Sequence, residues 1–459
     1  MTLRHVAVID IGKTNVKLAL VDLESLAELA VVTRPNRVLP GPPYPHFDMA
    51  GHWAFLLESL RNFHETYRID AISVTTHGAS GVLLDAAGNL ATPVLDYEYE
   101  GPNQVGTDYD ALRPDFALTG SPRLGCGLNL GAQLHWLFGS YPDLYARTAA
   151  ILTYPQYWGY LLTGTMATDV TSLGCHTDLW CPEKGQFSPL VDRLRIRNMI
   201  AVPRKSTDSL GPIKPDIAAH TGLDPATPVS CGIHDSNASL YPHLVKRKAP
   251  FCVVSTGTWV IAMAVGGKGV ALDPTRDTLV NVAANGQPVR SARFMGGRAF
   301  DLLTKGVDKT PTMDVMTDVL RSGVKLLPAV VSGSGPYPNH AARWIGSEPP
   351  VDSPQRAAAI GFYLALMTGT CLRLIGASGT TVIEGAFARN PAFLTMLSAV
   401  TGRDISASAS ATGTSIGAAM LAANSVFTPP SAEESIAGVH LDSIWYQYAA
   451  DWRAAVDPE

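Results

Sequence analysis

Several features that define large classes of proteins are scarce or missing in this sequence. Its 459 residues include six cysteines and no Cys-x-x-Cys pair, so neither a disulfide framework nor a paired-cysteine metal site is expected. The net charge is −5 and no long basic block occurs, which argues against a nucleic-acid partner. The first residues, MTLRHVAVIDIG, lack the charged and apolar regions of a secretory signal. These absences together favour a cytoplasmic protein with reduced thiols.

Long hydrophobic runs are also rare. Residues 249–267, APFCVVSTGTWVIAMAVGG, approach the length of a membrane span, but the Ser, Thr and Gly at their centre predict a buried β-hairpin. Residues 357–372 are too short to cross a bilayer and predict a core helix. The segment CHTDLWC, at residues 175–181, lacks the second ligand pair that a structural zinc site requires. We therefore expect no membrane partner and no zinc.

The residues that are abundant indicate an α/β protein with more than one domain. Apolar residues make up 46% of the chain and charged residues 16%, which is enough apolar material for large cores. Residues 5–22 have the pattern strand, tight turn, strand, and residues 251–265 repeat it. Strands then alternate with helical segments, which predicts α/β architecture. The basic segment 244–250 predicts a domain boundary.

The turn of the first hairpin, DIGKTNVK at residues 10–17, contains Gly-Lys-Thr but does not fit a P-loop. A P-loop has a further Gly five residues before its last Gly and leads into a helix, whereas this chain has Ala7 and a second strand. A hairpin turn can instead direct its amides and the Thr14 hydroxyl at phosphate oxygens, with positive charge from Lys13 and Lys17. Asp10 would then hold Mg²⁺ through water. The alternative is an ordinary turn in which Asp10 binds turn amides.

Two further segments are candidates for the same ligand. STGTW, at residues 255–259, places three hydroxyls and a Gly in one turn, and two matching turns suggest a bound nucleotide phosphate chain. EGAFARN, at residues 384–390, offers a Gly–Ala pair that lets a flat base approach the backbone, and Asn390 supplies a donor and an acceptor. The alternatives are a polar hairpin turn and a plain strand–helix loop.

The segment GIHDSNASL, at residues 232–240, places one carboxylate between a predicted strand and a predicted helix. Asp235 is either a helix cap, worth about 1 kcal/mol, or a general base that takes a proton from a sugar hydroxyl. The small residues that follow leave room for a ligand to approach. His234 is interpreted as a structural or substrate-facing neighbour of this carboxylate.

In chain order, these four segments resemble the motifs of the FGGY family of carbohydrate kinases, within the actin/Hsp70/sugar-kinase fold. DIGKTNVK is similar to the first phosphate motif of the family, Asp-x-Gly-x-Thr-x-x-basic, and STGTW to the second, with Thr256 at the γ-phosphate position. EGAFARNPAF resembles the adenosine motif. GIHDSNAS is closest to the His-Asp form of L-fuculokinases and L-rhamnulokinases, which implies that Asp235 is the general base. The resemblance extends to about residue 428.

This resemblance implies two ribonuclease-H-like α/β domains around a central cleft. Residues 1–245 would bind the sugar, residues 246–430 would bind ATP, and residues 431–459 would form a C-terminal tail. The implied reaction is ATP-dependent, in-line phosphorylation of a hydroxyl of a ketose, deoxyketose or related polyol. Mg²⁺ would be held by Asp10 and Asp235, through water. The implied partners are the sugar and ATP alone; the assembly state is open, with a homodimer as one option.

The candidate residues fall into two groups. The expected nucleotide and phosphate contacts are Gly12, Lys13, Thr14, Asn15, Lys17, Ser255, Thr256, Gly257, Gly385, Ala386 and Asn390. The expected sugar contacts are His77, Gly78, Ser80, Asp96, Glu98, His234 and Asp235.

Three departures from the family pattern affect the expected adenine and sugar contacts. Glu384 occupies a position that is usually Gly, while His77 and Ser80 replace an aromatic residue and an Asp in the sugar-contacting segment of deoxyketose kinases. Asp96 and Glu98 are the expected replacements as sugar contacts. The alternatives are a sugar-binding regulator with impaired catalysis and a non-kinase ATPase of the same fold.

Overall fold

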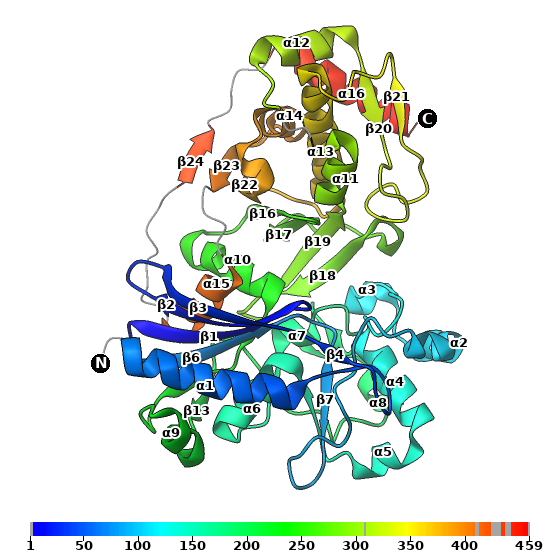
Figure 1. Ribbon diagram of the computed structural model, residues 1–459. Coiled ribbons are helices and arrows are strands. Elements are labelled where there is room, and N and C mark those ends of the chain that lie inside the picture. The colour runs from blue at the N-terminus through cyan, green and yellow to red at the C-terminus, as the bar shows by residue number, and fades with distance from the viewer. Residues whose placement is uncertain (1–2, 307–308, 409–412, 424–432, 437–441, 458–459) are drawn as a thin grey trace. The chain divides into compact units, whose positions relative to one another are not determined.

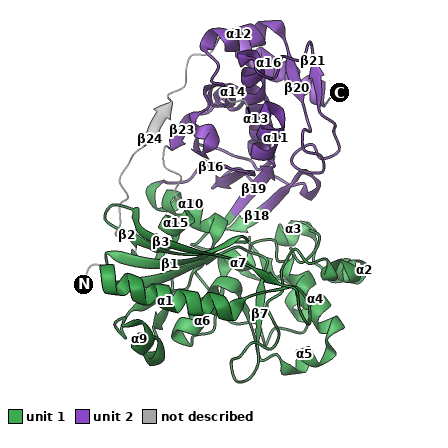
Figure 2. Ribbon diagram, in the orientation of Figure 1, with its two compact units in different colours: residues 1–246, 280–288, 412–429 green, residues 247–279, 289–411, 430–459 purple. Residues whose placement is uncertain are grey.

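The computed structural model describes residues 3–306, 309–408, 413–423, 433–436 and 442–457 (Figure 1). The chain forms two compact units (Figure 2). Unit 1 comprises residues 1–246, 280–288 and 412–429, and unit 2 comprises residues 247–279, 289–411 and 430–459. Unit 1 thus includes two segments from the second predicted domain. The division of function at residue 245 stays a prediction, and the predicted boundary at 430/431 lies outside the described residues.

Unit 1 is built on a seven-stranded sheet in which β1 and β2 form the predicted hairpin. The sheet order is β13-β14-β6-β1-β2-β3, and β15 pairs with β6. β1 pairs antiparallel with β2 and parallel with β6. The strands are β1 (His5–Ile11), β2 (Asn15–Asp22), β3 (Ala27–Pro35), β6 (Ala71–Thr76), β13 (Ser209–Pro212), β14 (Pro228–Ser230) and β15 (Ile233–His234).

Unit 2 repeats this arrangement around β16 and β17. Its sheet order is β18-β19-β17-β16-β22-β23-β24, and β16 pairs antiparallel with β17 and parallel with β22. The strands of this sheet are β16 (Phe251–Thr256), β17 (Val260–Val265), β18 (Thr278–Val282), β19 (Pro288–Phe294), β22 (Thr380–Gly385), β23 (Ile405–Ser408) and β24 (Glu433–Ile436). Residues 280–282 of β18 and Pro288 of β19 are grouped with unit 1. Six strands of each sheet therefore share one order with the same directions, while β15 and β18 have no counterpart, and this confirms the predicted repeat.

Helices and short ribbons complete each unit. The helices of unit 1 are α1 (Met49–Tyr67), α2 (Gly106–Leu112), α3 (Phe116–Thr119), α4 (Leu130–Ser140), α5 (Pro142–Arg147), α6 (Tyr154–Thr163), α7 (Val170–Leu173), α8 (Leu190–Arg193), α9 (Pro215–Thr221), α10 (Asp235–Lys246) and α15 (Thr414–Met420). Those of unit 2 are α11 (Gly296–Thr304), α12 (Met313–Ser322), α13 (Pro354–Leu374), α14 (Pro391–Thr401) and α16 (Ser443–Val456). The two-stranded ribbons are β4 (Val38–Leu39) with β5 (His46–Phe47), β7 (Gly81–Leu84) with β8 (Ala150–Thr153), β9 (Thr168–Asp169) with β12 (Pro203–Arg204), β10 (Trp180–Cys181) with β11 (Gln186–Phe187), and β20 (Lys325–Leu327) with β21 (Arg343–Ile345).

The predicted core helix is α13, and it is longer than the apolar run suggested. By length and composition it is the one described helix that would suffice to cross a membrane, but 83% of its apolar window is buried inside the protein. Gly369 of α13 lies so close to α14 that an added Cβ would come within 2.6 Å of Val400. Its apolar character is therefore explained by packing in the core of unit 2.

The small-residue helix predicted at residues 413–425 begins at Thr414 and packs tightly in unit 1. A Cβ on Gly417 would lie 1.8 Å from the carbonyl oxygen of Ala238, so α15 and α10 are in backbone contact. Its predicted last residues, 424 and 425, lie outside the described residues. This close packing brings the beginning of α15 to the sheet edge that carries the candidate site.

The predicted C-terminal tail contains a helix of unit 2. The Trp452 side chain of α16 is fully buried, and its indole N–H donates to the carbonyl oxygen of Leu326 at 2.7 Å. The spacing of aromatic residues in SIWYQYAADW carries this signal, because Trp445, Tyr448 and Trp452 recur at helical intervals and all three are buried.

Candidate functional site

The β1–β2 turn presents its backbone and one hydroxyl at the surface of unit 1. The Gly12 amide donates to the Asn15 carbonyl at 2.9 Å, and the Asn36 side-chain amide donates to the Gly12 carbonyl at 2.8 Å. Thr14 and Asn15 are both exposed, and the Asn15 side chain donates to the Thr14 hydroxyl at 3.2 Å. The turn is thus fixed by its own bonds, while the Thr14 hydroxyl hydrogen stays available.

Asp10, near the end of β1, is a mostly buried carboxylate beside one hydroxyl and one amine. Its Oδ2 accepts a hydrogen bond from the Thr414 hydroxyl at 2.7 Å and lies 3.3 Å from the Lys17 ammonium. Burial raises the pKa of Asp10; the Thr414 and Lys17 interactions oppose this, and the nearby charge of Asp235 adds to it. Thr414 was not among the predicted site residues. The feature that could have indicated it is a hydroxyl at the start of the predicted small-residue helix.

Asp235 is the first residue of α10, and about one third of its side chain is exposed. Its Oδ1 accepts from the backbone amide and the hydroxyl of Ser236. Within the described residues it accepts no hydrogen bond from the amides of residues 237 and 238, where a capping side chain would bind. The geometry therefore does not support the capping alternative, and it leaves carboxylate surface facing outward.

His234 links Asp235 to a buried cysteine. Its Nε2 lies 3.2 Å from Asp235 Oδ1 and 3.5 Å from the Cys175 sulfur. Burial would lower the pKa of His234, but the charges of Cys175 and Asp235 outweigh it and raise the pKa to about 9. Burial would likewise raise the pKa of Cys175, but the charges of His176 and His234 lower it to about 5. This pair fixes the ring beside Asp235, and Cys175 was not among the predicted site residues.

Three of the predicted site residues, Lys13, Asp96 and Glu98, contact one another in unit 1. The Lys13 ammonium pairs with Asp96 and, at 3.0 Å, with Glu98. It also lies over the Tyr97 ring, 4.7 Å from the ring centroid. Lys13, expected to bind phosphate, is therefore held by the two carboxylates expected to bind sugar.

His77, at the end of β6, presents an unpaired ring nitrogen. Its Nδ1 bonds to the Gly78 carbonyl, while its buried Nε2 has no hydrogen-bond partner within the described residues. Burial lowers the pKa of His77 to about 4, so the ring is neutral at physiological pH and Nε2 is an acceptor. The buried Ser80 hydroxyl is also unpaired within the described part of the chain. Gly78 has no room for a Cβ, which would lie 2.9 Å from His234 Nε2.

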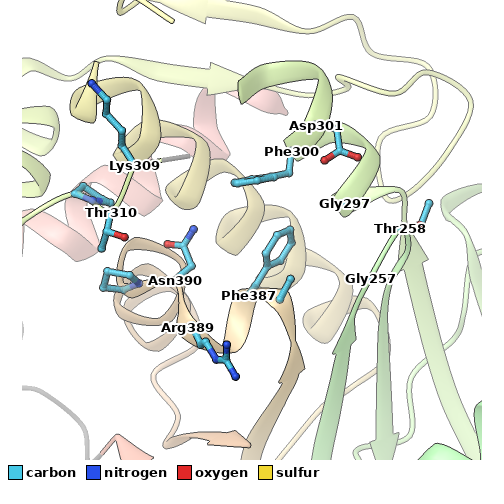
Figure 3. A pocket seen from close by; sticks show the side chains of 13 residues that line it. Gly257, Thr258, Gly297, Phe300, Asp301, Lys309, Thr310, Phe387, Arg389 and Asn390 are labelled. Carbon is cyan, nitrogen blue, oxygen red and sulfur yellow. The ribbon is translucent and has the colours of Figure 1, made fainter. Parts of the chain in front are cut away.

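Unit 2 contains a cavity of about 500 Å³ next to the β16–β17 turn (Figure 3). The side chains shown there come from this turn, from α11, from the segment at Lys309 and Thr310, and from the approach to α14. Of the predicted residues, Gly257, Ala386 and Asn390 line it. Asp301, Lys309 and Arg389 also line it and make no ion pair within the described residues. Sequence reasoning missed these three, because isolated surface charges carry no distinctive pattern.

The two threonines of the β16–β17 turn have different environments. The Thr256 side chain is buried; its hydroxyl donates to the Glu384 carbonyl at 2.5 Å and accepts from the Phe387 amide at 3.0 Å. Thr258 is exposed and lines the cavity. The hydroxyl-bearing residue that lines the cavity is therefore Thr258, which was not among the predicted site residues, whereas the Thr256 hydroxyl joins two loops. Ser255 does not line the cavity.

The β22–α14 connection supports the cavity wall. Asn390 caps α14, since its Oδ1 accepts from the Phe393 amide at 3.0 Å. This bond orients the side chain so that its NH₂ group is the part left to donate to a ligand. Gly385 has a φ of +85° and sits against Thr256, where a Cβ would lie 2.1 Å from the carbonyl oxygen. Glu384 is buried and does not line the cavity, so this departure from the family pattern leaves the lining unchanged.

Family models match nearly the whole chain. Residues 5–241 match the N-terminal domain of the FGGY family of carbohydrate kinases, and residues 248–430 match the C-terminal domain of carbohydrate kinase FGGY. An L-fuculokinase from Escherichia coli K12 is 29% identical over 203 residues, which are 42% of this chain and 41% of that protein. An autoinducer-2 kinase from Salmonella typhimurium is 23% identical over 60% of this chain and 54% of its own. These alignments thus span about half the length of the curated relatives.

Solved structures match over a greater length. A carbohydrate kinase from Novosphingobium aromaticivorans superposes with a TM-score of 0.90 at 36% identity, covering 99% of both chains. A xylulose kinase from Rhodospirillum rubrum has a TM-score of 0.78 at 20% identity, covering 98% of both chains. The second likeness shows the fold alone, and both confirm the predicted fold class of the two units.

Proposed function

Because the chain belongs to the FGGY family of carbohydrate kinases, we propose that it transfers the terminal phosphoryl group of ATP to a hydroxyl of a small sugar. The acceptor is a ketose, a deoxyketose or a related polyol. The names of the relatives, an L-fuculokinase among them, support this class of acceptor but not one sugar.

The observation that carries the proposal is the state of Asp235. Its carboxylate begins a helix, is partly exposed and binds neither of the amides that a cap would bind. The adjacent His234 ring, held by Cys175, restricts its orientation. A carboxylate whose position is fixed, but which keeps hydrogen-bonding capacity that the fold does not use, is suited to accept a proton from a bound hydroxyl.

In the proposed reaction, Asp235 removes the proton from the sugar hydroxyl as its oxygen attacks the γ-phosphorus. The neutral His77 Nε2 accepts a hydrogen bond from another hydroxyl of the acceptor, which satisfies a buried atom that otherwise has no described partner. The exposed Thr14 hydroxyl and the turn amides contact phosphate oxygens. Most of the rate enhancement then comes from positioning and charge stabilisation.

The residues around Asp10 fit a magnesium ion. Mg²⁺ keeps several waters and binds one or two carboxylates plus substrate phosphates, and Asp10 lies close enough to Asp235 for their charges to interact. Burial of Asp10 disfavours its charged form, which a divalent cation would favour. The ion would neutralise charge on the phosphate oxygens, while Thr414 and Lys17 hold the Asp10 carboxylate in place.

The nucleotide is assigned to the cavity of unit 2. The Asn390 NH₂ group donates to a ring nitrogen of the base, Thr258 and the turn amides contact phosphates, and Lys309 and Arg389 supply positive charge. The proposal requires that the terminal phosphate of this nucleotide reach the hydroxyl held by Asp235.

A coupled ADP-release assay over neutral ketoses, deoxyketoses, polyols and sugar acids tests the activity. We expect slow ATP turnover without acceptor and a large increase with at least one neutral acceptor. Asp235→Asn should lower kcat by about 10²–10⁴ with the fold intact. Asp216→Asn is a matched control, because Asp216 also lies in the first turn of a helix of unit 1, and it should leave kcat unchanged.

The same assay separates the alternatives. ATP turnover that no acceptor increases would indicate a non-kinase ATPase. Stabilisation by a sugar without ADP release would indicate a binding protein that has lost catalysis. Near-normal kcat in Asp235→Asn would remove Asp235 from the role of base.

A further inference from the structure

A second cavity of unit 2, of about 310 Å³, is lined by a cluster of cations. It shares no lining residue with the candidate nucleotide cavity. Lys268 comes from the loop after β17, Arg373 from the last turn of α13, Arg403 from the segment after α14, and Arg453 from the last turn of α16. No described lining residue is acidic. Four positive charges thus surround one small hollow without a compensating carboxylate in its wall.

The four cations differ in how the protein uses them. Arg403 donates to the Ala377 carbonyl, and the Arg453 Nε donates to the Ala449 carbonyl of its own helix at 3.3 Å. The side chains of Lys268 and Arg373 make no hydrogen bond or ion pair within the described residues. Two of the cations are therefore held in place, and two keep their donors for a ligand.

Helix dipoles explain part of this cluster but not all of it. Arg373 and Arg453 lie in the last turns of α13 and α16, and Arg403 follows the end of α14. Cations are favourable at these positions because helix C-termini carry partial negative charge. Lys268 lies outside any helix, so the dipoles give no reason for its place in the cavity wall.

We propose that this cavity binds a small phosphate ester. Guanidinium groups match the geometry of phosphate oxygens, and lysine supplies a compact point charge. The volume is at the lower end of the range for small-molecule sites, about 300–1,000 Å³. Val270, Leu372 and Val400 form apolar wall for the carbon part of the ligand.

The floor of the cavity is rigid enough to act as a preformed site. A Cβ on Gly376 would lie 2.3 Å from the Lys268 carbonyl oxygen, and the Lys268 amide donates to the Gly376 carbonyl at 2.7 Å. The loop that carries Lys268 is thus fixed against the end of α13. Helix α14 contributes its last residues, Val400 and Thr401, to this cavity, while its first residue, Pro391, and its cap, Asn390, line the candidate nucleotide cavity. Any coupling between the two cavities would change both affinities by the same factor.

Calorimetric titration of inorganic pyrophosphate into the full chain tests the proposal. ADP is present at saturation, so that phosphate contacts of the candidate nucleotide cavity are already occupied. We expect measurable binding at low salt that weakens as ionic strength rises. Lys268→Gln and Arg373→Gln should each weaken it by on the order of tenfold. Arg321→Gln is the control, because Arg321 lies in the last turn of α12 and does not line this cavity.

Absence of binding at millimolar pyrophosphate would overturn the proposal, as would equal binding by the two variants and the wild type. An equal loss in Arg321→Gln would also overturn it, because the effect would then be one of net charge. If Arg373→Gln fails to fold, two other variants still decide the question. Lys268→Gln changes an exposed residue and should weaken pyrophosphate binding, whereas Arg373→Lys preserves the charge and should retain binding. Binding is measured directly, so a chain without kinase activity would leave this result readable.

Discussion

Replacement of Thr256 by Val separates a structural hydroxyl from one that contacts a ligand. Val has nearly the shape of Thr, so the substitution removes the hydroxyl without opening a large cavity. The lost group donates to the Glu384 carbonyl and accepts from the Phe387 amide. Both bonds are within unit 2 and join the β16–β17 turn to the segment before α14.

The expected cost follows from the buried amide. Leaving a buried donor without its partner costs about 1–3 kcal/mol, and Thr256 is only 5% exposed. Thermal and urea unfolding should therefore show a loss of this size. Nucleotide affinity should fall only as far as the displaced loops distort the cavity.

Thr258→Val is the matched comparison in the same turn. Thr258 is exposed, so its replacement should change the free energy of unfolding by less than about 0.5 kcal/mol. A hydrogen bond to a charged phosphate is worth about 1.5–3 kcal/mol, which corresponds to a loss of ATP affinity of about 10–100-fold. The opposite pattern, with Thr256→Val stable but unable to bind ATP and Thr258→Val fully active, would refute this assignment.

Three further predictions concern two buried histidines and the two candidate sites. His52 lies in α1, with its Nε2 2.8 Å from the Asn36 side-chain oxygen, and His77 follows β6. Both have pKa values lowered to about 4, mainly by burial. The unfolded chain takes up these protons near 6.5, so urea titrations should show stability falling between about pH 6.5 and 4, by at most about 3 kcal/mol per histidine; a flat profile would contradict this. Asn390→Asp should keep the α14 cap and the stability yet weaken nucleotide binding, whereas Asn390→Ala should also lose about 1 kcal/mol of stability. Asp10→Asn should abolish Mg²⁺-dependent ADP release while leaving the melting temperature equal or higher, because it removes a costly buried charge; a lower melting temperature would show that the charge stabilises the unit.

The local patterns of the sequence predicted the elements that carry the site. β-Branched runs on either side of a Gly-containing turn identified both hairpins, and the registers Asp10↔Lys17 and Ser255↔Ile261 show how regular they are. The change from apolar strand to helix α10 at Asp235 could also be predicted, because each of these elements follows from the pattern of neighbouring residues. No local pattern indicates that the segments 280–288 and 412–429 group with unit 1, and the predicted functions of residues 1–245, 246–430 and 431–459 stay predictions.

Long-range partners could not be predicted from the same patterns. The bond between Thr414 and Asp10 joins positions 404 residues apart, and no periodicity reports such a pair. The choice between Thr256 and Thr258 depended on which of two nearby hydroxyls points toward the Phe387 amide. The link from Lys13 to Asp96 likewise depends on how two loops of unit 1 meet. Such contacts require the folded backbone, because they are set by tertiary packing.

The repeated hairpin carries a different cross-strand pair in each unit. In each unit the residue two positions before the turn glycine pairs across the hairpin: Asp10 with Lys17 in unit 1, and Ser255 with Ile261 in unit 2. The same backbone thus carries an ion pair in one copy and a neutral pair in the other. Burial raises the pKa of Asp10 even though the Lys17 ammonium lies 3.3 Å away and opposes this shift, and a second cation at the proposed magnesium site would favour the charged form further. Unit 2 has the neutral residues Ser255 and Ile261 at these positions, and the surroundings of its turn offer amides, the Thr258 hydroxyl and the cations of its cavity instead, which fits the nucleotide proposed to bind there.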